Sequence, residues 1–139
     1  MDAQRIGRLA AQQEVAELAT IDTDGLPHLV PICFAFVEDC LVTAIDQKPK
    51  STVRLTRLAN IGVNPEVAVL FHHYEDDWDR LWWVRANGMA RVEESGADRE
   101  AALEALEKKY EQYQRDPPRG PAIIVTVDRW QAWAATGSN

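Results

Sequence analysis

The sequence has no long apolar segment, no excess of basic residues and few cysteines. No hydrophobic run approaches the roughly 20 residues that cross a bilayer. The opening segment MDAQRIGRLAAQQ has neither the apolar core nor the small-residue cleavage site of a signal peptide. Acidic residues outnumber Lys and Arg by 22 to 15, which gives a net charge of -7. We therefore expect a cytoplasmic protein that binds neither nucleic acid nor an anionic membrane surface.

The two cysteines, Cys33 and Cys40, flank an expected two-residue turn at Glu38-Asp39. This turn pairs Val37 with Cys40 and leaves Cys33 further along the strand. A disulfide would need a different turn. We therefore expect two reduced thiols that pack as small hydrophobic side chains.

The 139 residues, 46% of them hydrophobic, are enough for one domain with a core, which we assign to residues 1–139. Apolar periodicity and turn residues predict the elements in order. These are a helix over 2–13, strands over 15–21, 28–37 and 40–45, a loop and short helix within 47–65, strands over 66–73 and 81–94, a helix over 97–116 and a strand over 121–133. Six strands with little parallel-sheet periodicity favour a barrel over a doubly wound fold.

Basic residues are concentrated in one short segment of this acidic chain. Between Asp46 and Glu66 there is no acidic residue. Lys50, Arg54 and Arg57 are spaced i, i+4 and i+7, so on a helix their side chains point the same way. The segment therefore presents a cationic helix face.

The start of this helix favours an anion. Lys48 precedes it, and Ser51 and Thr52 supply hydroxyl groups in the first turn. Free backbone N–H groups and the helix dipole at that end attract negative charge. The pattern predicts a phosphate site. The alternative is a solvated cationic face that balances acidic charge elsewhere.

These segments resemble the pyridoxamine-phosphate-oxidase-like split barrels, and look closest to the actinobacterial branch that uses the deazaflavin coenzyme F420. The resemblance covers roughly residues 5–133. Its sharpest elements are KPKSTVRLTRLANI, Asn64-Pro65 and DDWDRLWWVRANGMA. It implies a mainly β (α+β) fold, a six-stranded antiparallel split β-barrel with flanking helices. It also implies a homodimer with the cofactor in a groove between the subunits.

The resemblance assigns cofactor-binding roles within the basic segment. The family's principal phosphate-binding Lys or Arg lies seven residues before the Asn of the Asn-Pro pair, a position that Arg57 occupies here. Lys48, Lys50, Ser51 and Arg54 match the basic lead-in of the F420-type members. We include the neighbouring Thr52 in the predicted phosphate site.

Ring contacts are expected from other parts of the chain. By analogy with the family, backbone groups near Pro31 and Ile32 contact the cofactor ring. Trp78, in a loop between strands, is a candidate lid over the ring or an interface residue. Trp82 and Trp83 face opposite sides of a strand, so one is expected in the core and the other at a partner subunit. Simple packing is the alternative for each tryptophan.

His72 and His73 precede four acidic residues between positions 75 and 79. Adjacent histidines on a strand diverge, and the acidic residues lack the spacing typical of a ligand set. We therefore expect a solvated hairpin loop and no metal.

The chain departs from the vitamin B6 oxidases themselves. The stretch LVPICFA (29–35) has no basic residue, and Leu55-Thr56-Arg57 stands where those enzymes have Ser-Arg-Lys. Both differences favour F420 over FMN. We predict an oxidoreductase that transfers a hydride between F420 and a small-molecule substrate. The alternatives are an FMN-dependent oxidoreductase, a non-catalytic flavin, deazaflavin or tetrapyrrole binder, and a dimeric scaffold without a ligand.

Overall fold

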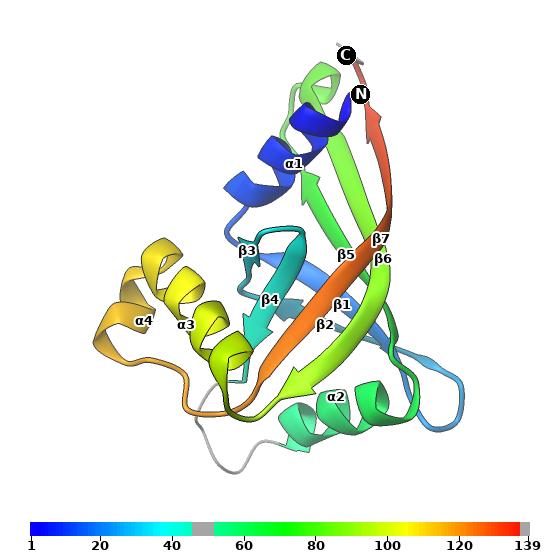
Figure 1. Cartoon of the computed structure of the whole chain (residues 1–139). Helices are drawn as coiled ribbons and strands as arrows, with labels where there is room; N and C mark the ends of the chain where they lie inside the picture. Colours follow the sequence, from blue (N-terminus) through cyan, green and yellow to red (C-terminus); the bar gives the residue numbers. More distant parts are fainter. Residues whose placement is uncertain (46–51, 137–139) are drawn as a thin grey trace.

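The computed structural model describes the backbone of residues 1–45 and 52–136, and the side chains of 1–45 and 56–136. Four helices, one 3-10 turn and seven strands follow one another in this part of the chain (Figure 1). They are α1 (Ala3–Gln12), β1 (Ala16–Ile21), β2 (Pro27–Ile32), β3 (Ala35–Val37), β4 (Cys40–Ala44), α2 (Thr52–Val63), β5 (Glu66–His73), η1 (Trp78–Arg80), β6 (Trp82–Glu93), α3 (Ala97–Lys109), α4 (Glu111–Arg115) and β7 (Ala122–Ala134).

The strands form one curled antiparallel sheet, a half-barrel, in the order β2-β1-β5-β6-β7-β4-β3. The prediction of six strands was wrong because the predicted strand 28–37 is two strands. β2 pairs with β1, and β3 pairs with β4 at the opposite edge of the sheet. The two-residue link Cys33-Phe34, between β2 and β3, does not take part in strand pairing. At Phe34 the backbone N–H donates to the Tyr110 hydroxyl, 3.0 Å away, instead of to a strand.

The predicted helix over 97–116 is also two elements, α3 and α4, with a break at Tyr110. Tyr110 has extended backbone angles (φ -117, ψ 117). Its side-chain contacts with distant backbone offset the local preference for a continuous helix. The longest described helix, α3, has 13 residues, and no helix in the described part of the chain is long and apolar enough to cross a membrane.

Two hairpins join neighbouring strands, β1 to β2 and β3 to β4, and the second contains the turn predicted at Glu38-Asp39, which is confirmed. In the first, the Asp22 carboxylate accepts hydrogen bonds from the N–H groups of Asp24 and Leu26, both at 2.9 Å, and Gly25 adopts φ 82. In the second, Glu38 has φ 52 and Val37 pairs with Cys40. Cys33 and Cys40 are free thiols, as expected.

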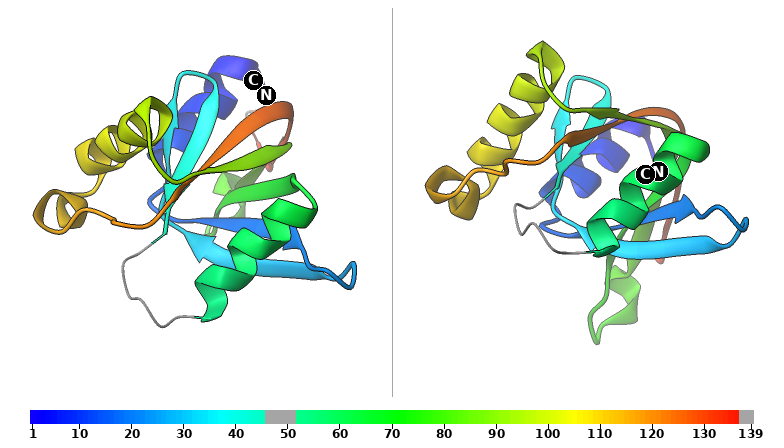
Figure 2. Two further views of the ribbon diagram at one scale, coloured as in Figure 1. Left: turned by 60° about the horizontal axis from the view of Figure 1, so that its bottom comes forward. Right: turned by 90° about the horizontal axis from the view of Figure 1, so that it is seen from below.

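The core fills the concave side of the sheet, and helices cover its flanks (Figure 2). Fully buried side chains include Leu18, Phe34 and Phe71. A second cluster packs α3, through Leu103 and Leu106, against β4 and β7. Figure 2 shows α2 across one end of the sheet, whereas α3 and α4 lie to one side. The end of β2 lies between these two helical units.

Candidate cofactor site

A buried hydrogen bond anchors α2 to the sheet. Asn60 is 2% exposed, and its Nδ2 donates to Oγ1 of Thr20, on β1, at 3.0 Å. At the end of the helix the Asn64 N–H donates to the Asn60 carbonyl (2.8 Å), and Oδ1 of Asn64 accepts from the N–H of Glu66 (3.1 Å). The bond between Asn60 and Thr20 limits the rotation of α2 on the sheet and with it the direction of Arg57, three residues before Asn60. The two bonds of Asn64 are local to the end of the helix.

Arg57 is half-buried, and its Nε is buried without a hydrogen-bond partner among the described residues. Burial lowers the pKa of Arg57, and the Tyr113 phenol opposes that shift. Within residues 1–45 and 56–136, no carboxylate forms an ion pair with this guanidinium. A desolvated cation with an unused donor is suited to an anionic ligand, which would supply a charge-assisted hydrogen bond.

The junction of α3 and α4 contacts the link between β2 and β3. The Tyr110 and Tyr113 side chains border the same hollow as Cys33. Burial raises the pKa of the Cys33 thiol, although Lys109 and the two tyrosine hydroxyls act in the opposite direction. The two tyrosine rings pack edge to face, with centroids 5.6 Å apart. We call this unit, formed by Cys33, Tyr110 and Tyr113, the tyrosine corner of the site.

The tyrosine corner brings α2 and the end of β2 to one place. Tyr113 lies close enough to Arg57 to affect its pKa, and it also contacts Cys33. Cys33 directly follows Ile32, the last residue of β2. The predicted ring contacts at Pro31 and Ile32 therefore end beside the tyrosine corner.

β2 can offer mainly backbone groups to a ligand. Ile32 is 5% exposed because its side chain enters the core, whereas Pro31 is exposed and stands opposite Glu17 of β1. β2 is an edge strand of the sheet, so one side of its backbone does not pair with another described strand. The contact of this backbone with a cofactor ring stays a prediction.

Comparison with known proteins identifies the family. A family profile described as pyridoxamine 5'-phosphate oxidase matches residues 4–134. The chain belongs to this family. None of the curated proteins matches the sequence.

Solved structures at low sequence identity share the fold. A conserved hypothetical protein, Rv2991 of Mycobacterium tuberculosis, superposes with a TM-score of 0.80 at 19% identity, over 97% of this chain and 86% of that one. An FAD-binding protein of Mycobacterium smegmatis has a TM-score of 0.69 at 16% identity, over 96% of each chain. An FAD-binding protein of Mesorhizobium loti has a TM-score of 0.64 at 17% identity, over 95% of this chain and 94% of that one.

The structure describes part of the phosphate site predicted for this family member. Lys48, Lys50 and Ser51 lie outside the described residues, and Thr52 and Arg54 are described by their backbone alone. Arg57 is the predicted cation whose side chain is described. Sequence reasoning missed the tyrosine corner. The available signal was the presence of two of the three tyrosines of the chain, three positions apart, at a helix end.

Trp78 does not join this site within one subunit. It is 67% exposed and lies in η1, beyond the end of β5 that is farther from α2 (Figure 1). The eight residues of β5 span about 26 Å. The predicted alternation of the paired tryptophans is confirmed. Trp82 packs against the core, and Arg85 covers the ring of Trp83 at 5.3 Å.

The histidines bind neighbouring carboxylates. His72 Nε2 lies 2.8 Å from Glu17 Oε1, and His73 Nε2 lies 2.5 Å from Glu75 Oε2. In the part of the chain that the structure describes, no group of three or more His, Cys, Asp or Glu side chains is arranged to hold a metal ion.

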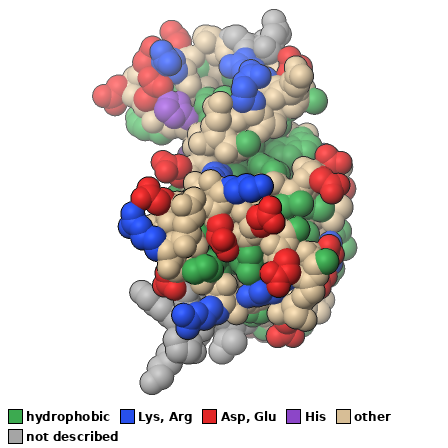
Figure 3. All heavy atoms as spheres, turned by 60° about the vertical axis from the view of Figure 1, so that its left-hand side comes forward, with side chains coloured by type: hydrophobic (Ala, Val, Ile, Leu, Met, Phe, Trp, Pro, Cys, Tyr) green, Lys and Arg blue, Asp and Glu red, His purple; other side chains and the backbone are tan. Residues whose placement is uncertain are grey.

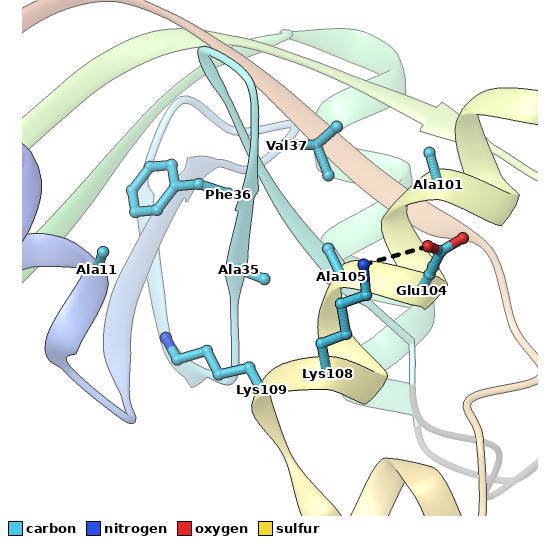
Figure 4. Close-up of a pocket in the computed structure, with 9 residues that line it drawn as sticks. All are labelled: Ala11, Ala35, Phe36, Val37, Ala101, Glu104, Ala105, Lys108 and Lys109. Atoms are coloured by element: carbon cyan, nitrogen blue, oxygen red, sulfur yellow. Dashed lines mark ion pairs between the residues drawn. The ribbon is translucent and has the colours of Figure 1, made fainter.

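The groove between α1 and α3 is separate from the predicted site. It encloses about 580 Å³ over β3 and contains none of the predicted residues (Figure 4). Lys108 pairs with Glu104 at 3.3 Å on its rim, and Lys109 reaches from α3 toward α1. The face that carries α3 and α4 shows acidic and basic side chains interspersed (Figure 3). This mixed surface offers no single-sign field to a charged polymer.

Proposed function

We propose that this protein is an oxidoreductase that binds a phosphate-bearing flavin-type cofactor, coenzyme F420, and transfers a hydride between it and a small-molecule substrate. The observation that carries the proposal is the half-buried Arg57 guanidinium, with an unused Nε donor and no carboxylate partner among the described residues. Its place, seven residues before Asn64, is the phosphate-binding place in the family that the chain belongs to.

Each predicted site residue would have a role in cofactor binding that follows from its position. Arg57 would bind the phosphate, together with Lys48, Lys50, Ser51, Thr52 and Arg54 of the same segment. Backbone near Pro31 and Ile32 would orient the ring, while the core behind Ile32 would exclude water from one side. The bound cofactor supplies the hydride-transfer chemistry.

F420 is favoured over FMN because the 29–35 stretch has no basic residue. F420 also carries an acidic glutamate tail, which suits a cationic segment in a chain of net charge -7. The two FAD-binding neighbours favour a second candidate, a flavin-dependent oxidoreductase or a flavin-binding protein without turnover. FMN and FAD therefore belong in the same test.

The cofactor groove is proposed to lie between the subunits of a homodimer. Exposed apolar side chains support this arrangement, because a monomer would leave them in water. Leu29 on β2 is 65% exposed, Trp133 on β7 is 45% exposed and Trp78 in η1 is 67% exposed. In a dimer, η1 of one subunit could cover the ring held by its partner, which is the role proposed for Trp78.

Fluorescence titration of the purified protein with F420, FMN and FAD tests the proposal, with sedimentation of the same sample to measure its mass. We expect F420 to bind most tightly. An Arg57→Ala, Lys50→Ala variant should lose at least ~1.5 kcal/mol of binding free energy, the size of lost charged hydrogen bonds. Unchanged affinity in that variant would remove the phosphate-site assignment, and failure of all three cofactors to bind the wild-type protein would refute the proposed function.

A further inference from the structure

A hollow of about 520 Å³ opens at the tyrosine corner. It is lined by Cys33, Tyr110, Gln112, Tyr113, Arg115 and Asp116. Except for Cys33, every lining residue belongs to the α3–α4 junction and the segment that follows it. The volume lies in the usual range of small-molecule pockets, roughly 300–1,000 Å³.

Three neighbours indicate what this hollow can hold. Cys33, one of its lining residues, directly follows the strand whose last residues are the predicted ring contacts. One wall is the edge-to-face pair of Tyr110 and Tyr113, an aromatic surface that suits a planar ring. Tyr113 also lies within electrostatic range of Arg57. A ligand with its phosphate at Arg57 and its ring beyond Ile32 would meet this wall.

The two tyrosines have different structural duties. The Tyr110 hydroxyl accepts the Phe34 N–H (3.0 Å) and donates to the Glu14 carbonyl (2.8 Å), so this side chain is used by the fold. Tyr113 packs on Tyr110 and contacts Cys33 in the hollow. Tyr113 therefore borders the hollow, whereas the bonds to the backbone of Phe34 and Glu14 are made by Tyr110.

We propose that the hollow at the tyrosine corner receives the ring system of the cofactor, and that Tyr113 is a specificity-determining residue that packs against this ring. The inference rests on the proposed function and extends it, because the α3–α4 junction becomes a third wall of the site, beside α2 and the end of β2. A planar aromatic ring is the ligand chemistry that this wall recognises.

Cys33 provides a chemical probe of the hollow, and Cys40 provides the control. Cys40 lies on β4, with its sulfur 3.8 Å from Thr126 Oγ1, and does not line the hollow. In a Cys40→Ser variant, FMN or F420 at ten times its dissociation constant should slow alkylation of Cys33 by N-ethylmaleimide about tenfold. In a Cys33→Ser variant, the same ligands should leave the alkylation rate of Cys40 unchanged.

A titration with inorganic phosphate distinguishes binding of an anion at Arg57 from binding of a ring in the hollow. At a saturating concentration phosphate should protect Cys33 less than about twofold, because it occupies the Arg57 end and leaves the hollow open. Equal protection by phosphate and by FMN or F420 would overturn the placement of the ring. So would tight binding of a cofactor that leaves the alkylation rate of Cys33 unchanged, although the proposed function would then stand.

Substitution of Tyr113 tests its role directly. Tyr113→Ala should weaken binding of FMN or F420 about tenfold and shift the absorbance spectrum of the bound ring, whereas Tyr113→Phe keeps the aromatic surface and most of the affinity. Gln114→Ala on the same short helix controls for loosening of α4. Equal affinities and spectra in all three variants would refute the role of Tyr113. Failure of wild-type protein to bind any of the cofactors would refute both the function and this inference.

Discussion

Arg57 on α2 and Lys109 on α3 are both half-buried cations, but the fold treats them differently. Lys109 donates to the Gln13 carbonyl at 2.7 Å and places its ammonium 3.5 Å from the centroid of the Phe34 ring. Arg57 has an Nε without a partner among the described residues. Burial lowers the pKa of both groups, that of Lys109 to about 8. The fold therefore uses the charge of Lys109, whereas its described part gives the Nε of Arg57 no partner.

The largest effect on stability is expected where α3 meets the β2–β3 link. Tyr110→Phe removes the hydroxyl that accepts the N–H of the buried Phe34 and donates to Glu14. Loss of these bonds should lower the free energy of unfolding by about 2 kcal/mol, measured by urea denaturation. Tyr74→Phe is the matched control because Tyr74 is 68% exposed, and it should change the value by less than about 0.5 kcal/mol. Equal effects of the two substitutions would contradict a structural role for Tyr110.

A smaller effect should appear in the pH dependence of stability through Lys109. Its pKa of about 8 in the folded protein lies below the ordinary value of 10.5, so between these pH values the unfolded chain binds more protons. The contribution of Lys109 to stability therefore rises with pH from about 8 to 10.5. The free energy of unfolding of wild type minus that of Lys109→Met should increase over this interval.

Two neighbours act in the opposite direction over part of that range. Burial raises the pKa of Tyr110 to about 12 and also raises the pKa of Cys33. The contribution of each group to stability therefore falls as the pH rises above the ordinary pKa of that group. The comparison is therefore best repeated in a Cys33→Ser background at pH values below the titration of Tyr110. If the difference in free energy of unfolding between wild type and Lys109→Met stays constant with pH, the proposed contrast between Lys109 and Arg57 is wrong.

The smallest effect on stability is expected at Arg57. Arg57→Met removes a desolvated charge for which the described fold supplies no carboxylate, so the free energy of unfolding should stay within about 0.5 kcal/mol or rise. Thermal and urea unfolding in the absence of added cofactor would measure this. A loss of more than about 2 kcal/mol would show that the fold itself uses the guanidinium, and the contrast between the two cations would disappear.

Local patterns in the sequence were sufficient for many elements. The predicted strand over 66–73 agrees with β5, and α2 ends inside the segment 47–65 that was predicted to hold a short helix, because alternation of apolar residues and turn chemistry act over a few residues. Arg57 was predicted as a site residue from its spacing to Asn64. The structure adds that its Nε is buried without a partner among the described residues, and the role of Arg57 in binding a cofactor stays a prediction.

Tertiary contacts determined the structure at the positions where the sequence patterns predicted it wrongly. One apolar segment over 28–37 became β2 and β3, and one helix over 97–116 became α3 and α4. Both breaks meet at the hydrogen bond from the Phe34 N–H to the Tyr110 hydroxyl, between residues that are 76 positions apart in the chain. No window of a few residues contains such a contact.

The sequence by itself determined the order of the elements, the hairpin turns, the acidic balance and the cationic segment that carries Arg57, since each depends on neighbouring residues. Only the tertiary structure decided which cation is already used by the fold and which aromatic side chains border the proposed site. These properties depend on burial and on partners distant in sequence, and they arise only when α2, α3 and the end of β2 come together.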